Sequence, residues 1–311
     1  NMEFRILRKL IIGVSLLLGA ASCTKEVQID IPGYKDQIVI DGSIETGQPA
    51  IVLLSKTNNV YSPTNFQAYL EGFVSGATVT ISNGVETDTL TEICSDNLPP
   101  GTEEIAAAFF GLPVDVLVNL HLCAYISFGM VGEIGKTYSL KVIHNGSEFT
   151  ASTNIFNPTP LDSLYWKPEG SFLDRGFSWV KLSDPAQSGD SYAWQVKLAG
   201  MPNFKRTFNP FFNDKFFNGQ TFDFAYENPM SFDDPNGDPA YRGYYKLGDT
   251  IIVKLSKIGK REYNFFEKKY NQMYSGGNPF ATPTNVPTNI QGGAIGIWVG
   301  YSPWFDTLVC Q

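Results

Sequence analysis

Histidine and positive charge are scarce in this sequence. Only 2 histidines occur in 311 residues, which leaves little scope for metal centres or acid–base chemistry built on imidazole. The 31 acidic residues outnumber the 23 Lys and Arg, and the formal net charge of −8 argues against a nucleic-acid-binding protein. Charged residues make up 17% of the chain, below the roughly 25% of an average globular domain.

Long apolar runs are also lacking. No segment approaches 18 uninterrupted apolar residues, so we expect no transmembrane helix. An apolar content of 43% is nevertheless too high for a disordered chain and predicts a packed core. The excess lies in aromatic residues, with 23 Phe, 15 Tyr and 5 Trp, separated by 29 Gly and 19 Pro. This composition is typical of pleated strands joined by tight turns.

The N-terminus has the layout of a secretory signal. A basic start precedes the apolar run 10–18, and small residues follow, ending in Ala20-Ala21-Ser22-Cys23. The last four residues resemble a bacterial lipobox. We therefore predict a lipoprotein signal peptide over 1–22, lipidation of the Cys23 thiol, and a polar tether over 23–37.

Residues 38–156 have the pattern of a β-sandwich. Short β-branched runs occur at 38–44 and 51–55, and two alternating hairpins follow, with turns at Asn83-Gly84 and Asn145-Gly146. An Asn-Gly pair between alternating strands predicts a two-residue turn in which both residues have positive φ. We expect an immunoglobulin-like sandwich here.

A different composition interrupts this sandwich at about 102–120. Thr102 is placed to cap an Ala-rich helix, and a proline follows where a second helix begins, which predicts a helical-hairpin insert. Cys94 and Cys123 flank the insert. In an exported protein such a pair favours a disulfide, with two buried thiols as the alternative. Cys310 is left over, and we expect it to be buried.

The stretch 156–160 contains two prolines and predicts a linker. Beyond it, residues 161–311 repeat the strand pattern, except at about 260–274, where aromatic residues recur at helical spacing. The predicted class is therefore mainly β. It comprises two immunoglobulin-like β-sandwich domains, the first with a helical-hairpin insert and the second with one amphipathic helix.

No catalytic constellation is evident. His121 and His144 lack the spacing of a metal pair or of a nucleophile-activating base, which favours structural roles. We expect no enzyme, no catalytic residues and no cofactor. Asp234, Asn236 and Asp238 form a weak calcium candidate, but a proline follows where an EF-hand loop requires glycine. An acidic surface turn is the favoured interpretation.

Aromatic residues are densest after residue 203, with eight phenylalanines between 204 and 224. Adjacent Phe-Phe pairs place one ring on each face of a strand, so some rings must face outward. Clustered exposed aromatics mark interaction surfaces. The candidate binding surface comprises Phe211, Phe212, Phe216, Phe217, Tyr241, Tyr244 and Tyr245. The alternative is that these rings fill the sandwich core and cover the helix.

Four Asp-Ser/Thr-apolar triplets resemble the O-glycosylation motif of Bacteroidota periplasmic and surface proteins. The candidate acceptors are Thr89, Ser163, Thr250 and Thr307. The motif is short, and chance matches to it are expected.

Several longer stretches carry a resemblance to a known family. They are 23–26, 38–42, 74–79, 135–140, and, most specifically, 213–219 and 278–293. Together they are similar to a Bacteroidota outer-membrane lipoprotein family catalogued as a domain of unknown function. The resemblance implies an all-β lipoprotein, lipid-anchored to the outer membrane at the cell surface or on the periplasmic face, and often encoded beside TonB-dependent receptors. It implies no catalytic residues.

From the lipobox, the missing catalytic constellation and this resemblance, we expect a non-enzymatic outer-membrane lipoprotein. It would work as an accessory or binding component beside a TonB-dependent transporter. The alternative is a free-standing surface adhesin that binds a glycan or a peptide. A hydrolase with an unrecognised carboxylate pair is the remote alternative. The expected partners are the outer membrane, through the lipid anchor, and a TonB-dependent receptor.

Overall fold

The computed structural model describes residues 36–57, 72–170, 172–275 and 285–311. The predicted signal peptide, the lipidation site Cys23 and most of the predicted tether lie outside these residues. The described chain is mainly β, as predicted. Its strands form one eight-stranded sheet and two four-stranded sheets.

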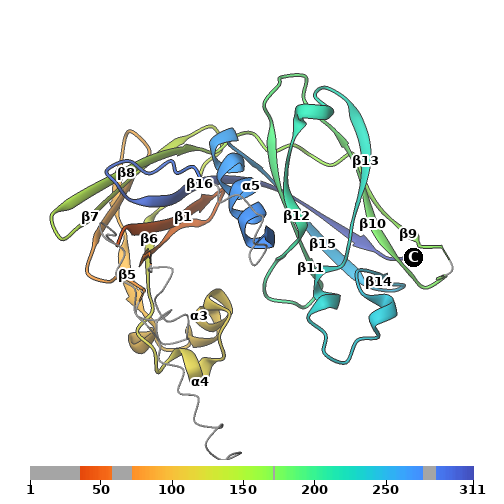
Figure 1. Cartoon of the computed structure of the whole chain (residues 1–311), viewed down its shortest axis with the longest axis horizontal. Coiled ribbons are helices and arrows are strands. Elements are labelled where there is room, and N and C mark those ends of the chain that lie inside the picture. Colours follow the sequence, from red (N-terminus) through yellow and green to blue (C-terminus); the bar gives the residue numbers. More distant parts are fainter. Residues whose placement is uncertain (1–35, 58–71, 171, 276–284) are drawn as a thin grey trace, which may run out of the picture.

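The eight-stranded sheet runs through both halves of the molecule, in the order β12-β11-β15-β16-β1-β2-β6-β5. Its strands are β1 (Ile38–Glu45), β2 (Pro49–Lys56), β5 (Thr91–Cys94), β6 (Cys123–Val131), β11 (Ser191–Leu198), β12 (Lys205–Asn213), β15 (Thr250–Ile258) and β16 (Ile295–Val309). Figure 1 shows a smaller sheet on each side, with helix α5 (Lys260–Ser275) between the two halves.

Strand β16 joins the halves. Its first part pairs in parallel with β1, ending at Glu45↔Tyr301, and its second part pairs antiparallel with β15, beginning at Lys257↔Ser302. This differs from the expectation that everything after residue 161 belongs to the second sandwich. Gly296 is needed where β16 enters, because its φ is +121° and a Cβ there would lie 2.0 Å from the Ile40 carbonyl oxygen.

In the first half, the sheet β4-β3-β7-β8 packs on the β16-β1-β2-β6 part of the large sheet. Its strands are β3 (Thr78–Ser82), β4 (Thr87–Thr89), β7 (Thr137–His144) and β8 (Ser147–Asn154). Burial alternates strictly along most of β7, which places one face of the strand in the core. The core is largely aliphatic, and Ile40, Leu54, Ile81 and the ring of Trp298 are fully buried in it.

The two Asn-Gly turns differ. Asn145 and Gly146 have φ values of 48° and 75°, and the flanking residues pair directly, so the predicted two-residue turn is present there. In the first hairpin Ser82 pairs with Thr87, which leaves a four-residue loop, and the two-residue prediction is wrong. The reason is local: the Asn83 side chain accepts the N–H groups of the two residues before Thr87, which forms an Asx-type turn.

The insert between β5 and β6 contains α3 (Glu103–Phe110) and α4 (Val114–Leu117), within the predicted helical hairpin. Gly111 ends α3 in the left-handed conformation with a φ of 68°. Thr102 makes no side-chain cap, contrary to expectation, because its hydroxyl donates to the Pro99 carbonyl instead. Ala107, Leu117 and Leu122 form a small core of their own.

In the second half, a sheet with the order β13-β10-β14, in which β9 also pairs with β10, packs on the β12-β11-β15 part of the large sheet. Its strands are β9 (Ser163–Pro168), β10 (Arg175–Ser183), β13 (Thr221–Tyr226) and β14 (Tyr245–Lys246). Tyr192 and Trp194 point into this core, while Ala193 between them faces α5 on the opposite side of the large sheet. Helix α5 lies where the aromatic spacing predicts it.

Candidate functional site

The most distinctive surface feature lies between β12 and β13. Each is the last strand of its own sheet, so the two strands border the same open side of the second half. A groove of about 400 Å³ lies between them. We call it the aromatic groove, and it is lined by Phe208, Asn209, Phe211, Phe212, Phe217, Phe222, Phe224, Ala225, Tyr226 and Glu227.

The pair Phe211-Phe212 sets the back of the groove. Because adjacent strand residues point to opposite faces, the two rings separate. Phe211 stacks on Phe266 of α5, with ring centroids 4.3 Å apart and planes 1° from parallel. Phe212 turns into the sandwich and stacks on Tyr192 at 5.2 Å.

The edge strand β12 is irregular at this point. Asn209 has a φ of 52°, Pro210 provides no N–H, and the pairing register with β11 shifts nearby. These are features that blunt a sheet edge against the addition of another strand. Recognition in the groove would therefore rest on side-chain rings more than on backbone pairing.

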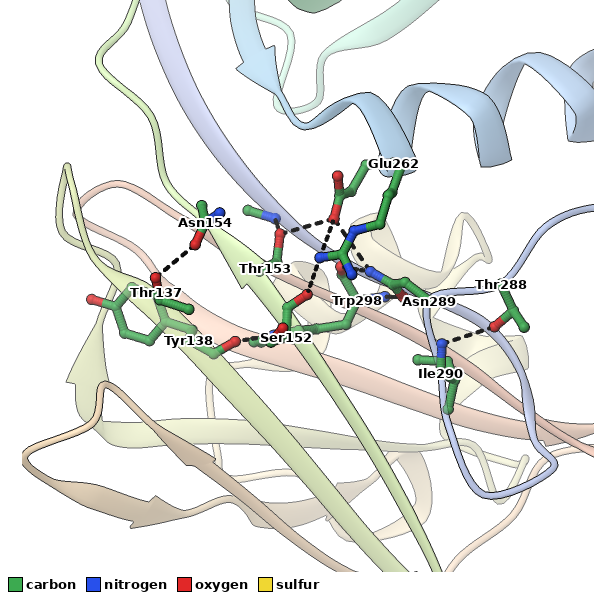
Figure 2. Close-up of polar contacts among 12 residues, drawn as sticks. Thr137, Tyr138, Ser152, Thr153, Asn154, Glu262, Thr288, Asn289, Ile290 and Trp298 are labelled. Atoms are coloured by element: carbon green, nitrogen blue, oxygen red, sulfur yellow. Dashed lines mark hydrogen bonds and ion pairs between the residues drawn. The ribbon is translucent and has the colours of Figure 1, made fainter.

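Helix α5, which supports Phe211, is fastened to the first half of the molecule. Figure 2 shows the buried Glu262 carboxylate accepting hydrogen bonds from Thr153 of β8 and from Asn289, both at 3.3 Å. Asn289 in turn bonds the backbone N–H and carbonyl of Trp298 in β16. The helix and its ring Phe266 therefore have a fixed position beside the groove.

The floor of the groove is a chain of half-buried rings. Phe217 and Phe222 have centroids 4.0 Å apart, and Phe224 follows Phe222 at 5.1 Å. Phe224 also contacts Phe212 edge-on at 5.5 Å, which connects these rings to strand β12. Offset and edge-on ring pairs of this kind hold one another in place, so the apolar floor is pre-formed.

Polar groups lie at one end. The Glu227 carboxylate accepts the N–H of Phe208, whose ring is 58% exposed at the rim. Burial, and secondarily the charge of Glu227, raise the pKa of Tyr226, so its hydroxyl remains protonated at neutral pH. Among the lining residues that the structure describes, Glu227 is the only carboxylate. The groove can bind a flat apolar surface, but it lacks the carboxylate pair of a glycosidase.

Three of the predicted surface residues, Phe211, Phe212 and Phe217, line the groove. Phe216 is 85% exposed but lies outside the lining. The sequence prediction did not include the other lining residues. The alternation in Thr221-Phe222-Asp223-Phe224-Ala225-Tyr226 is a signal that indicates three of them, because it puts three rings on one face of a strand.

The three predicted tyrosines lie elsewhere. Tyr241 and Tyr244 pack around Phe172, at centroid distances of 5.3 and 5.8 Å. Tyr245 is fully buried in the second core, so its assignment to an exposed surface is wrong. The reason is strand alternation: Tyr245 begins β14, and the first residue of that strand points inward.

The weak calcium candidate has the bonds of a surface turn. Asp234 accepts the backbone N–H of Asn236, and Asp238 caps the short 3₁₀ helix that follows by accepting the N–H of Ala240. All three predicted ligands are exposed. The side-chain oxygens of Asp234 and Asp238 thus bond the local backbone.

The two cysteines that flank the insert form a disulfide. Cys94 and Cys123 stand directly opposite each other on β5 and β6. The His121 Nε2 atom lies 3.5 Å from the Cys123 sulfur, and its Nδ1 atom lies 2.8 Å from the Asp96 carboxylate. Spacing alone gives no sign of this cluster, because the insert separates its two sides by more than 20 residues. The paired patterns Cys-x-Asp and His-x-Cys are the only signal for it.

The remaining predicted residues are dispersed. Cys310 is buried in the second core, and burial raises the pKa of its thiol to about 12. Of the candidate glycosylation residues, Thr89, Ser163 and Thr307 are exposed, and Thr250 is half-buried.

Within the described residues, no helix has the length and apolar character needed to cross a membrane. No curated protein matches the sequence. A family model described as "Domain of unknown function (DUF4249)" matches residues 24–303. This span covers nearly the whole chain, and the protein therefore belongs to the DUF4249 family.

Proposed function

We propose that this protein is a non-enzymatic binding lipoprotein, and that its ligand or partner occupies the aromatic groove. The observation that carries the proposal is the pre-formed floor of half-buried rings between two sheet edges, with the exposed Phe208 at its rim. Apolar pockets with a few polar groups at one end are the usual form of a binding site. Aromatic residues at such sites also supply a large share of binding energy.

The location and partner in this proposal come from the sequence. A lipobox ending at Cys23 supports a lipid anchor. The resemblance to Bacteroidota outer-membrane lipoproteins supports an accessory role beside a TonB-dependent transporter. In this proposal the two halves act as immunoglobulin-like sandwiches that hold the groove away from the membrane.

A free-standing adhesin is the second candidate, and the blunted β12 edge bears on its ligand. Because Asn209 and Pro210 interrupt backbone pairing, an added peptide strand would find few partners. The stacked rings favour a glycan, whose sugars present flat apolar faces, over an extended peptide.

Affinity purification of the native, tagged lipoprotein from solubilised membranes tests the transporter role. We expect a TonB-dependent transporter to co-purify with the wild-type protein. Its co-purification should be lost with the Phe208→Ala variant. Phe216→Ala is the matched control, because it removes an equally large exposed ring outside the groove.

A glycan array with the same three proteins tests the adhesin role. Loss of an aromatic ring that contacts the ligand costs about 2 kcal/mol, or roughly 30-fold in affinity. The adhesin would be supported if glycan binding falls to this extent with Phe208→Ala and no transporter co-purifies with the wild type. A binding role for the groove would be contradicted if the wild type neither co-purifies with a transporter nor binds a glycan. It would also be contradicted if Phe208→Ala and Phe216→Ala reduced binding equally.

A further inference from the structure

The cluster at the base of the insert contains more than a disulfide. Cys94, His121 and Cys123 bring their ligand atoms within 4.8 Å of one another. Cys123 is buried and Cys94 half-buried, whereas the His121 side chain is 58% exposed. The cluster therefore has a buried sulfur side and a side open to solvent.

The spacing between His121 and Cys123 matches a tetrahedral metal site. Zinc binds thiolate sulfur at about 2.3 Å and imidazole nitrogen at about 2.0–2.1 Å, so two such ligands on one ion lie about 3.6 Å apart. The observed Nε2–Sγ separation is 3.5 Å. Two thiolates on one ion lie about 3.8 Å apart, a separation open to opposed residues on neighbouring strands once the S–S bond is cleaved.

Asp96 prepares the imidazole for this role. Its carboxylate can only accept a hydrogen bond, so the Nδ1 atom of His121, 2.8 Å away, donates to it. In the neutral ring the lone pair is then on Nε2, the atom beside the sulfurs. A carboxylate that holds the far nitrogen of a histidine is the usual outer partner of a metal-binding imidazole.

We propose that, when the disulfide is reduced, Cys94, His121 and Cys123 bind one thiophilic divalent ion such as Zn²⁺. A dithiol supplies two electrons and two protons, leaves as a cyclic disulfide, and converts the protein disulfide into two thiols. Metal binding then displaces the two thiol protons. The fourth position faces solvent and takes water or an exchangeable anion, so either an S–S bond or a metal ion closes the base of the insert.

Cobalt titration of the full mature chain tests the proposal. Co²⁺ bound by thiolates gives a charge-transfer absorption, and Zn²⁺ displaces it because the site prefers zinc. We expect one Co²⁺ per chain in the reduced protein and none in the oxidised protein. Asp96→Ala, which removes only the outer partner, should weaken binding about 10–100-fold. His121→Asn should weaken it at least as much, and His144→Asn and Cys310→Ser are matched controls that should leave it unchanged.

Circular dichroism of the same samples covers the case in which reduction unfolds the chain. Zn²⁺ should then restore the native spectrum, because an ion that binds only the folded state stabilises it. The proposal is contradicted by a reduced chain that gives no thiolate–cobalt absorption, by His121→Asn binding as tightly as the wild type, or by a reduced, unfolded chain that Zn²⁺ does not refold.

Discussion

The two halves of the molecule share one sheet and are filled differently. The first core consists mainly of aliphatic side chains around Trp298, and burial alternates strictly along most of its strand β7. The second core contains Tyr192, Trp194 and Tyr245, and it continues outward into half-buried rings. Large flat rings can pack on one side and remain accessible on the other. In the second half, the rings at the edge of the core are therefore also the rings that form the proposed binding surface.

The outer surface of the first half provides the contrast. A hollow of about 470 Å³ lies on the β4-β3-β7-β8 sheet, and it is larger than the aromatic groove. Its lining is dominated by Thr, Ser and Lys side chains of the solvent-facing positions, such as Thr80, Ser139 and Thr150. We favour the groove as the binding site, because its lining consists mainly of aromatic rings, which supply a large share of the energy at binding sites.

The largest effect is expected where the two halves meet. Trp298 lies late in the chain, yet its ring is fully buried in the first core and donates to the Tyr138 carbonyl at 2.9 Å. Trp298→Ala should lower the free energy of unfolding by about 3–5 kcal/mol, measured by urea denaturation. Trp194→Ala should cost a similar amount in the second core.

Because β16 belongs to both halves, the two halves should unfold in one shared transition. Each tryptophan variant should move the midpoint of that transition to a lower urea concentration. Two separate transitions, with each variant affecting only one of them, would show that the halves unfold independently and would break the account of a continuous sheet.

The next largest loss of stability is expected from removal of the disulfide in the first half. Cys94 and Cys123 are separated by 29 residues, and closing a loop of that length contributes about 3–4 kcal/mol in the chain-entropy model. The double variant Cys94→Ser, Cys123→Ser should lose about this much stability under metal-free oxidising conditions. A loss below about 1 kcal/mol would mean that the insert's own small core holds it without the bond.

The stability of the second half should depend on pH through the buried carboxyl of Asp184. Asp184 is 6% exposed, and burial raises the pKa of its carboxyl above the usual 3.8 although Tyr192 donates to it. The folded state then holds the proton more tightly than the unfolded state, so this contribution is present below pH 3.8 and lost as pH rises through the folded pKa. Relative to Asp184→Asn, the wild type should become less stable over that rise. A stability difference that stays constant with pH would contradict the raised pKa.

The smallest stability effect is expected at the groove rim. Phe208 is 58% exposed, and Phe208→Ala should change the free energy of unfolding by no more than about 0.5 kcal/mol. Thermal denaturation is sufficient to check this. A larger loss would mean that the ring belongs to the core, and a loss of binding in that variant would then have a structural cause.

Much of the local structure follows from sequence pattern, because its causes are local. The helix α5, the turn at Asn145-Gly146 and the insert lie where spacing and turn chemistry predict them. The path of β16 could not be predicted, since its pairing with β1 joins residues more than 250 positions apart and no local pattern encodes it.

The same limit applies to the site. Adjacent phenylalanines indicate that some rings face outward, and Phe211 and Phe212 do take opposite faces. Which rings meet depends on two sheets that approach each other, so the partnership of β12 with β13 lies beyond sequence reasoning. The contacts of His121 with Asp96 and of Cys123 with Cys94 depend in the same way on the pairing of β5 with β6.

Site-specific photo-crosslinking in the native cell shows directly whether the aromatic groove is the binding surface. A benzoyl-phenylalanine replaces Phe208 in the groove, Phe216 just outside it, or Thr80 on the hydroxyl-lined hollow of the first half. Mass spectrometry of the recovered lipoprotein then reports any adduct. We expect a discrete adduct at position 208, with little at 216 and none at 80. Adducts at position 80 with none at 208 would place the binding surface on the first half and exclude the aromatic groove.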